Sequence, residues 1–268
     1  MTVRIDRARF GPWAMVTGAS SGIGKEFATQ IAASKINLVL VARREELLKE
    51  LGSELTAKFK IEHRIVVADL SKDNAIDELK QGTADLDLGL IVSNAGTANP
   101  GTFLKLDRTI LVDTLKLNTL AHLEIAHHFG KRLALRKCGG LWFVGAMGAP
   151  IGIPYLANDA GAKAYVQSFS QAIHEEFAPL GINVTVLPVG PTETPVLDKF
   201  GMTPDMMPMK PMRSEQCVSE GLQALLDNQS VWIPGPMNRI MHRLVPAGFT
   251  RSMMGKMFRK LEMKKAKV

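Results

Sequence analysis

Short apolar runs rich in β-branched residues alternate with longer stretches of helical character along most of this chain. Because each run is continuously apolar, rather than alternating between apolar and polar residues, we expect strands that are covered on both faces. The helical stretches between them are typical of the crossovers of a parallel sheet. The sequence therefore predicts a doubly wound α/β fold with a parallel seven-stranded sheet between two layers of helices. The seven runs are residues 13–18, 36–42, 61–68, 88–94, 140–146, 182–188 and 231–234.

The composition indicates a globular protein with a substantial apolar core. Of the 268 residues, 46% are hydrophobic and 22% are charged, which excludes a disordered or fibrous chain. The two cysteines, Cys138 and Cys217, lie far apart, and no Cys and His residues have the spacing of metal ligands, so we expect neither disulfides nor a metal site. No apolar run reaches the ~18 residues of a membrane span, and the first ten residues carry four charges. We therefore expect no signal peptide, no membrane span and a cytoplasmic location.

The net charge of +7 is concentrated near the carboxyl end of the chain. Residues 238–268 contain nine Lys and Arg but one Glu, whereas the rest of the chain has 24 basic and 25 acidic residues. A nearly neutral body lacks the broad basic surface with interleaved aromatic residues that nucleic-acid binding requires, so we expect no nucleic-acid partner. The nine basic residues are Arg239, Arg243, Arg251, Lys256, Arg259, Lys260, Lys264, Lys265 and Lys267.

A segment rich in methionine and proline interrupts the alternation. Residues 201–212 contain five Met and three Pro, which disfavour a long helix but can present an adaptable apolar surface. We interpret residues 195–215 as a flap over a substrate. The alternative is an irregular connection without a functional contact.

The last part of the chain, residues 237–268, predicts a basic amphipathic helical tail after a body of residues 1–236. Three contacts are open to its apolar face: an anionic membrane, which would make the protein membrane-associated, a lipophilic pocket that the tail closes, or the body of the protein. The apolar residues at helical spacing are Met253, Met254, Met257, Phe258 and Leu261.

The first predicted strand leads directly into a glycine-rich turn, residues 17–24 (TGASSGIG), which is followed by helical residues 25–31. Glycine permits a tight turn and a close approach of the backbone to a pyrophosphate. The helix that follows presents unpaired N–H groups and the positive end of its dipole to an anion. Strand, turn and helix in this order predict a phosphate-binding site.

The sequence TGASSGIG resembles the TGxxxGxG motif of the short-chain dehydrogenase/reductase family, and ordered similarities continue through residues 12–234. Asn94-Ala95-Gly96 resembles the family's NAG, and residues 190–194 resemble its PGxxxT segment, with Val189 replacing the proline. The resemblance implies a Rossmann-like fold, a nicotinamide-dependent oxidoreductase, a homodimer or homotetramer, and a small lipophilic ketone or alcohol as substrate. The cofactor-binding residues that it implies are Gly18, Ser20, Ser21, Gly22, Ile23, Gly24, Asp69, Leu70, Asn94, Ala95, Gly96, Lys163, Gly190, Thr192 and Thr194.

The end of the second predicted strand indicates which dinucleotide is preferred. Members of the family that use NAD place a carboxylate there for the ribose 2′-hydroxyl, whereas this chain has Ala42. The next residues, Arg43 and Arg44, could pair with a 2′-phosphate through charge-assisted hydrogen bonds. We therefore predict that NADP(H) is preferred over NAD(H); the alternative is that both arginines are solvated residues at the start of a helix.

The catalytic segment departs from the family, which uses a Ser, a Tyr and a Lys four residues after the Tyr. Only the lysine is retained: Lys163 places Asp159 at the tyrosine position and Ala146 at the serine position. We reject the register that would make Tyr155 the acid, because Asp159 would then stand at the lysine position. The candidate catalytic residues are Asn118, Asp159 and Lys163, and the candidate substrate contacts are Ala146, Met147 and Tyr155.

This atypical active site leaves three hypotheses open. The first retains hydride transfer between NADP(H) and a lipophilic ketone or alcohol, with Asp159, Lys163, Asn118 and water relaying protons. The second is a non-redox enzyme in which Asp159 acts as a base. The third is a catalytically silent nucleotide-binding protein in which Asp159 and Lys163, one helical turn apart, form only a structural ion pair.

Overall fold

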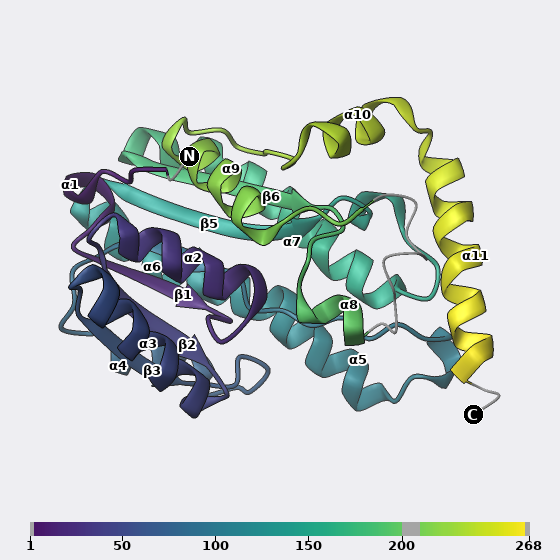
Figure 1. The fold of residues 1–268 in the computed structure, drawn as a ribbon, viewed down its shortest axis with the longest axis horizontal. Coiled ribbons are helices and arrows are strands. Elements are labelled where there is room, and N and C mark those ends of the chain that lie inside the picture. The colour runs from purple at the N-terminus through teal and green to yellow at the C-terminus, as the bar shows by residue number, and fades with distance from the viewer. Residues whose placement is uncertain (1–2, 200–209, 266–268) are drawn as a thin grey trace.

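The computed structural model describes residues 3–199 and 210–265 of the chain. Its centre is a six-stranded parallel sheet with the strand order β3-β2-β1-β4-β5-β6 (Figure 1). The order reverses between β1 and β4, which confirms the doubly wound α/β prediction. The strands are β1 Trp13–Thr17, β2 Asn37–Ala42, β3 His63–Val67, β4 Leu88–Ser93, β5 Gly139–Ala146 and β6 Ile182–Val189.

Helices cover both faces of the sheet, as continuous apolar strands require. Successive residues of β1 bury opposite faces: Ala14 and Val16 pack with α2, α3 and α9, whereas Met15 packs with α4, α6 and α7. The helices are α1 Arg7–Phe10, α2 Gly22–Ala33, α3 Glu45–Phe59, α4 Ala75–Gly82, α5 Arg108–Leu115, α6 Ala121–Arg136, α7 Ala157–Phe177, α8 Pro195–Lys199, α9 Ser214–Leu226, α10 Pro236–Leu244 and α11 Ala247–Lys265. Short helical turns lie at η1 Phe103–Lys105, η2 Lys116–Leu120, η3 Ala149–Ile151 and η4 Ala178–Leu180.

The prediction of a seventh strand at residues 231–234 is wrong. Val231 forms a single bridge with Val186, where the Trp232 N–H donates to the Val186 carbonyl at 3.1 Å. The pairing ends there because Pro234 has no N–H to continue a ladder, and Gly235, with a φ of 85°, turns the chain into α10.

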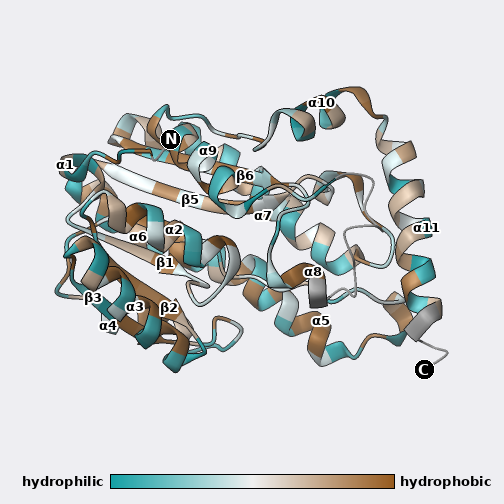
Figure 2. Ribbon diagram, in the orientation of Figure 1, coloured by the Kyte–Doolittle hydropathy of each residue, from teal (hydrophilic) through white to brown (hydrophobic). Residues whose placement is uncertain are grey.

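The last two helices run along the outer margin of the molecule, away from the strands (Figure 1). Polar and apolar residues are interspersed along α11 (Figure 2), and its Phe258 packs with Ile153 beside η3. The Arg251 Nε donates to the Ile151 carbonyl at 2.8 Å. The apolar face of α11 therefore lies on the body of the protein. Within the described ranges no helix is both long and apolar enough to cross a membrane.

The segment predicted as a flap is described only in part. Residues 200–209 lie outside the described residues. The described residues on the two sides of this gap are hydrogen-bonded to each other. The Met212 N–H donates to the Pro191 carbonyl at 3.0 Å, and the Met212 carbonyl accepts from the Glu193 N–H at 2.9 Å. The flap interpretation stays a prediction.

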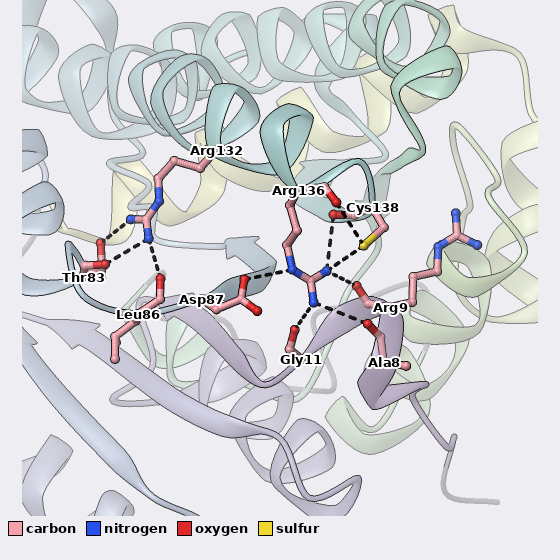
Figure 3. A network of polar contacts seen from close by, with 9 residues as sticks. All are labelled: Ala8, Arg9, Gly11, Thr83, Leu86, Asp87, Arg132, Arg136 and Cys138. Carbon is pink, nitrogen blue, oxygen red and sulfur yellow. Dashed lines mark hydrogen bonds and ion pairs between the residues drawn. The ribbon is translucent and has the colours of Figure 1, made fainter.

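A partly buried arginine at the end of α6, Arg136, joins several segments of the fold (Figure 3). The Arg136 Nε lies 2.9 Å from the Asp87 carboxylate, and its two other nitrogens donate to the carbonyls of Arg9 and Gly11. One guanidinium thus joins α6, the start of β4 and the segment that follows α1. Arg132, one turn earlier, donates to the Leu86 carbonyl at 2.6 Å.

Replacing Arg136 with methionine is expected to lower the free energy of unfolding by about 3 kcal/mol. The change removes charge-assisted hydrogen bonds and leaves partly buried carbonyl groups without a donor. Urea denaturation measures the loss. The matched control is Lys131→Met on the same helix, where the side chain is exposed and the loss should stay within about 0.5 kcal/mol. Equal losses in the two variants would contradict this role of Arg136.

Candidate functional site

A cavity of about 1040 Å³ lies at the carboxyl ends of the strands and extends to α10 and α11. This is the edge of a doubly wound sheet where ligands bind. Three of the predicted site residues, Gly24, Asn118 and Tyr155, do not line it. The predicted residues that line it are Gly18, Ser20, Ser21, Gly22, Ile23, Arg43, Arg44, Asp69, Leu70, Asn94, Ala95, Gly96, Ala146, Met147, Asp159, Lys163, Gly190, Thr192 and Thr194.

The glycine-rich turn joins β1 to α2 at one end of the cavity. Gly18 and Gly22 have φ values of 68° and 55°, in the left-handed region that favours glycine. A Cβ at Gly24 would lie 2.3 Å from the Gly18 carbonyl oxygen, so this glycine lets α2 pack closely on the turn. The backbone cradle at the start of a 12-residue helix has the form that binds a pyrophosphate.

Hydrogen bonds join the ends of β1 and β4 beneath this turn. The Thr17 hydroxyl oxygen accepts from the N–H groups of Asn94 and Ala95 at 2.9 and 3.0 Å. The Asn94 Nδ2 donates to the Thr17 carbonyl at 2.9 Å. These contacts fix the floor of the cavity at the point where the strand order reverses, which explains why the NAG segment needs an asparagine.

Two arginines lie at the end of β2, beside the glycine-rich turn. The Arg44 Nη2 donates to the Ser20 and Ser21 hydroxyls at 2.8 and 3.0 Å. The Arg43 Nη1 lies 3.8 Å from an Asp69 carboxylate oxygen. Burial alone would raise the pKa of Asp69, but hydrogen bonds from Ser71 and the charge of Arg43 bring that pKa below its usual value. Positive charge therefore borders this end of the cavity, and Ala42 contributes no carboxylate.

Lys163 and Asp159 lie together at the other end of the cavity. The Lys163 Nζ donates to the Val144 carbonyl at 3.0 Å. Burial lowers the pKa of Lys163 to about 8, although the negative charge of Asp159 acts in the opposite direction. Asp159 is 6% exposed, and its Oδ1 accepts from the Asn99 N–H at 3.2 Å. Ala146 lines the same cavity but has no hydroxyl group to donate.

Asn118 is fully buried in the π-helical turn η2. Its Oδ1 accepts from the Thr97 N–H at 2.9 Å, and its Nδ2 donates to the Thr97 carbonyl at 2.7 Å. A Cβ at Gly96 would lie 3.2 Å from both the Asn118 Oδ1 and the Lys163 Nζ. Asn118 therefore holds the loop that follows β4 against Lys163.

The structure places Tyr155 away from the reacting end of the cavity. Its backbone has a φ of 66°, and its carbonyl accepts from the Gly101 N–H at 2.8 Å. The side chain packs with Ile153 and Phe258. Asp159, by contrast, lines the cavity and acts electrostatically on Lys163.

Apolar side chains of the last two helices form the far wall of the cavity. Met241 and Val245, in and just after α10, line it although sequence reasoning did not include them. Their spacing of four residues, with the buried Asn238 three residues before Met241, is a helical signal that could have revealed them. The α11 residues that line the cavity are Met253, Met254, Met257 and Phe258.

The histidines of α6 are not arranged as ligands. His122 is buried, its Nδ1 lies 2.6 Å from the Ser93 hydroxyl, and burial, followed by the charge of Lys163, lowers its pKa well below the usual value. It is therefore a neutral packing residue at neutral pH. Across residues 3–199 and 210–265 no group of three His, Cys, Asp or Glu side chains could hold a metal ion.

A sequence profile described as short chain dehydrogenase matches residues 12–204 of this chain. The chain belongs to this family. Short-chain dehydrogenases are oxidoreductases that bind NAD(P)(H).

Curated relatives of this short-chain dehydrogenase include two very-long-chain 3-oxoacyl-CoA reductases. The one from Podospora anserina is 38% identical over 179 residues, which are 65% of this chain and 53% of the relative. The one from Rattus norvegicus is 32% identical over 203 residues, 71% of this chain and 65% of the relative. The chain thus spans about half the length of the first relative and about two thirds of the second.

Two solved dehydrogenases share most of the fold of this chain. A 7β-hydroxysteroid dehydrogenase superposes with a TM-score of 0.85 at 26% identity, covering 93% of this chain and 98% of its own. A short-chain dehydrogenase from Sphingobium yanoikuyae in complex with NADPH gives a TM-score of 0.79 at 25% identity, covering 94% and 95%. Both likenesses cover a larger share of this chain than the family profile, which ends at residue 204.

Proposed function

We propose that this protein uses NADP(H) to interconvert a lipophilic ketone and the corresponding alcohol. The observation that carries the proposal is that one cavity contains the phosphate turn, the Lys163–Asp159 pair and a wall of methionines. When bound, the dinucleotide supplies or accepts a hydride at its nicotinamide ring. The chain must then hold the cofactor, position the carbonyl group and move one proton.

The residues around the cavity fit a dinucleotide that carries a 2′-phosphate. The start of α2 and the glycines of the turn receive the pyrophosphate, and Arg43 and Arg44 pair with the 2′-phosphate. Gly190, Thr192 and Thr194 line the same cavity as Lys163 and would border the nicotinamide. Asp69 and Leu70 would lie beside the adenine.

Lys163 is the proton donor in this proposal. Its ammonium is anchored on the Val144 carbonyl, and its pKa of about 8 is close to neutral pH, which suits a general acid. Asp159 keeps the ammonium charged and passes protons to it through water, while Asn118 holds the facing loop. Because Ala146 and Asp159 offer no neutral hydroxyl to the carbonyl oxygen, we expect slow turnover.

The proposed substrate carries its carbonyl group on a long apolar chain. Polarisable methionine side chains fill irregular apolar spaces, and four of them line the wall formed by α10 and α11. The relatives are named for 3-oxoacyl thioesters with very long chains, so such thioesters belong in the first substrate panel.

The test follows the nicotinamide absorbance with a panel of 3-oxoacyl thioesters, steroid ketones and bulky ketones, using NADPH and then NADH. The proposal predicts NADPH oxidation with at least one apolar ketone. Nucleotide binding without turnover of any substrate would favour a silent binding protein, a candidate that the missing hydroxyls at residues 146 and 159 support. Conversion of a substrate without nucleotide would favour Asp159 as the base of a non-redox reaction.

The double variant Arg43→Ala/Arg44→Ala is expected to weaken NADP⁺ binding by roughly 10- to 100-fold, since charge-assisted hydrogen bonds to a phosphate are lost. NAD⁺, which lacks the 2′-phosphate, should lose less than about threefold. Calorimetric titration with both nucleotides measures the difference. Arg108→Ala removes an exposed arginine outside the cavity and is the control. Equal affinities for the two nucleotides, unchanged in the double variant, would refute the NADP(H) preference.

The homodimer or homotetramer and the cytoplasmic location stay predictions. Light scattering on the purified protein measures the first, and fractionation of cells measures the second.

A further inference from the structure

Helix α10 has one side that faces the body of the protein and another that is exposed and apolar. One side carries Met241 and the buried Asn238, faces the body and lines the cavity. The other carries Met237, Ile240 and Leu244, which are 56%, 49% and 72% exposed. Because these residues follow at spacings of three and four, they form one continuous stripe along the helix, which we call the α10 stripe.

Exposed positive charges accompany the α10 stripe. Residues 236–263 contain one acidic residue, Glu262, and its carboxylate is engaged with Thr102 on the body. At the start of α11 the large apolar side chain of Phe249 is 63% exposed. The exposed basic residues of the two helices are Arg243, Arg251, Lys256, Arg259 and Lys260.

This surface is continuous with the cavity. His242 and Ala247 line the cavity and are themselves exposed, so the cavity reaches the surface at the turn between α10 and α11. The apolar face of α11 is already packed on Ile153 and cannot serve a second contact without detaching. The exposed apolar surface at the cavity mouth therefore belongs to α10 and to Phe249 at the start of α11.

We propose that the α10 stripe and Phe249 dock on an anionic lipid surface, with the basic residues of α10 and α11 against the lipid headgroups. An exposed apolar stripe flanked by Lys and Arg is the pattern of helices that lie in a membrane interface. Docking in this way places the cavity mouth at the bilayer. A lipophilic substrate then enters from the membrane without crossing water, and this last step rests on the proposed function.

Co-sedimentation of the full chain with sucrose-loaded vesicles tests the docking. Vesicles contain phosphatidylcholine alone or with about one third phosphatidylserine, at ~0.1 M salt. We expect binding to the anionic vesicles, at least tenfold weaker binding in Ile240→Ser/Leu244→Ser, and loss of binding as the salt concentration rises. The variant Arg243→Gln/Lys256→Gln should lose affinity for anionic vesicles only.

The matched control is Leu135→Ser, which removes an 85% exposed leucine from α6 and should bind vesicles like the wild type. Docking is overturned if wild type and Ile240→Ser/Leu244→Ser bind anionic vesicles equally, or if neither binds. It is also overturned if light scattering shows that the α10 stripe is buried between two copies, so that the variant becomes a monomer.

The outcome is distinguishable from that of the proposed function. Ile240 and Leu244 do not line the cavity, so turnover of a small water-soluble ketone should be unchanged in Ile240→Ser/Leu244→Ser. Turnover of a long-chain substrate presented in vesicles should fall with vesicle binding. Vesicle binding without any NADPH oxidation would support the docking proposal and contradict only the proposed function.

Discussion

Replacing Lys163 with methionine is expected to lower the rate of NADPH-dependent ketone reduction about 10³-fold, which is typical of the loss of a general acid. The ammonium is anchored 3.0 Å from the Val144 carbonyl oxygen and has a pKa of about 8. Methionine fills most of the same space but has no proton to donate. Single-turnover measurements of nicotinamide absorbance, with enzyme in excess over the ketone, separate this step from product release.

The variant needs a second substitution as its control. Lys163→Met leaves the carboxylate of Asp159, only 6% exposed, without its neighbouring cation, which by itself destabilises the fold. Lys163→Met/Asp159→Asn removes both charges. We expect the double variant to regain thermal stability without regaining the rate. A Lys163→Met rate within about tenfold of wild type would show that the proton comes from another group.

The double variant Ala146→Ser/Asp159→Tyr is expected to raise the rate of reduction by roughly 10²–10³-fold, because hydroxyl donors stabilise the negative charge that develops on the carbonyl oxygen. Ala146 has no such donor. A carboxylate at residue 159 accepts hydrogen bonds but has no hydroxyl hydrogen to donate. The same nicotinamide assay measures the gain, with the melting temperature as a check on folding.

Ala146→Ser/Asp159→Phe is the matched control for this gain. Phenylalanine has nearly the size of tyrosine but no hydroxyl group, so this variant should stay well below the tyrosine variant. An equal gain in both variants would mean that the change acts through packing. No gain in a folded tyrosine variant would mean that the missing hydroxyls do not limit turnover.

The sheet could be predicted from the sequence because five of its six strands, all but the edge strand β3, are apolar on both faces, and such runs are stable only between two layers of helices. The run at 231–234 is equally apolar, but Pro234 and Gly235 end its pairing after one bridge. An apolar run does not show how many partners its backbone finds.

The candidate site was predictable where a residue acts locally in the chain. The glycine-rich turn and the Asp159–Lys163 pair depend on neighbours within a few residues, so their spacing is visible in the sequence. The contacts of Asn118 with Thr97, and of Tyr155 with Gly101, join segments whose approach no local pattern specifies. The wall at Met241 and Val245 likewise depends on how α10 returns to the body.

The pH dependence of single-turnover NADPH oxidation in wild type and in Lys163→Arg tests proton donation by Lys163 most directly. Because burial lowers the pKa of Lys163 to about 8, the ammonium predominates below this pH and is lost above it. The wild-type rate should be constant at low pH and fall about tenfold per pH unit above about 8. Arginine stays protonated, so Lys163→Arg should be slow and show no such fall. A wild-type rate that does not change between about pH 6 and about pH 10, or a fall near pH 8 that persists in Lys163→Arg, would contradict the assignment.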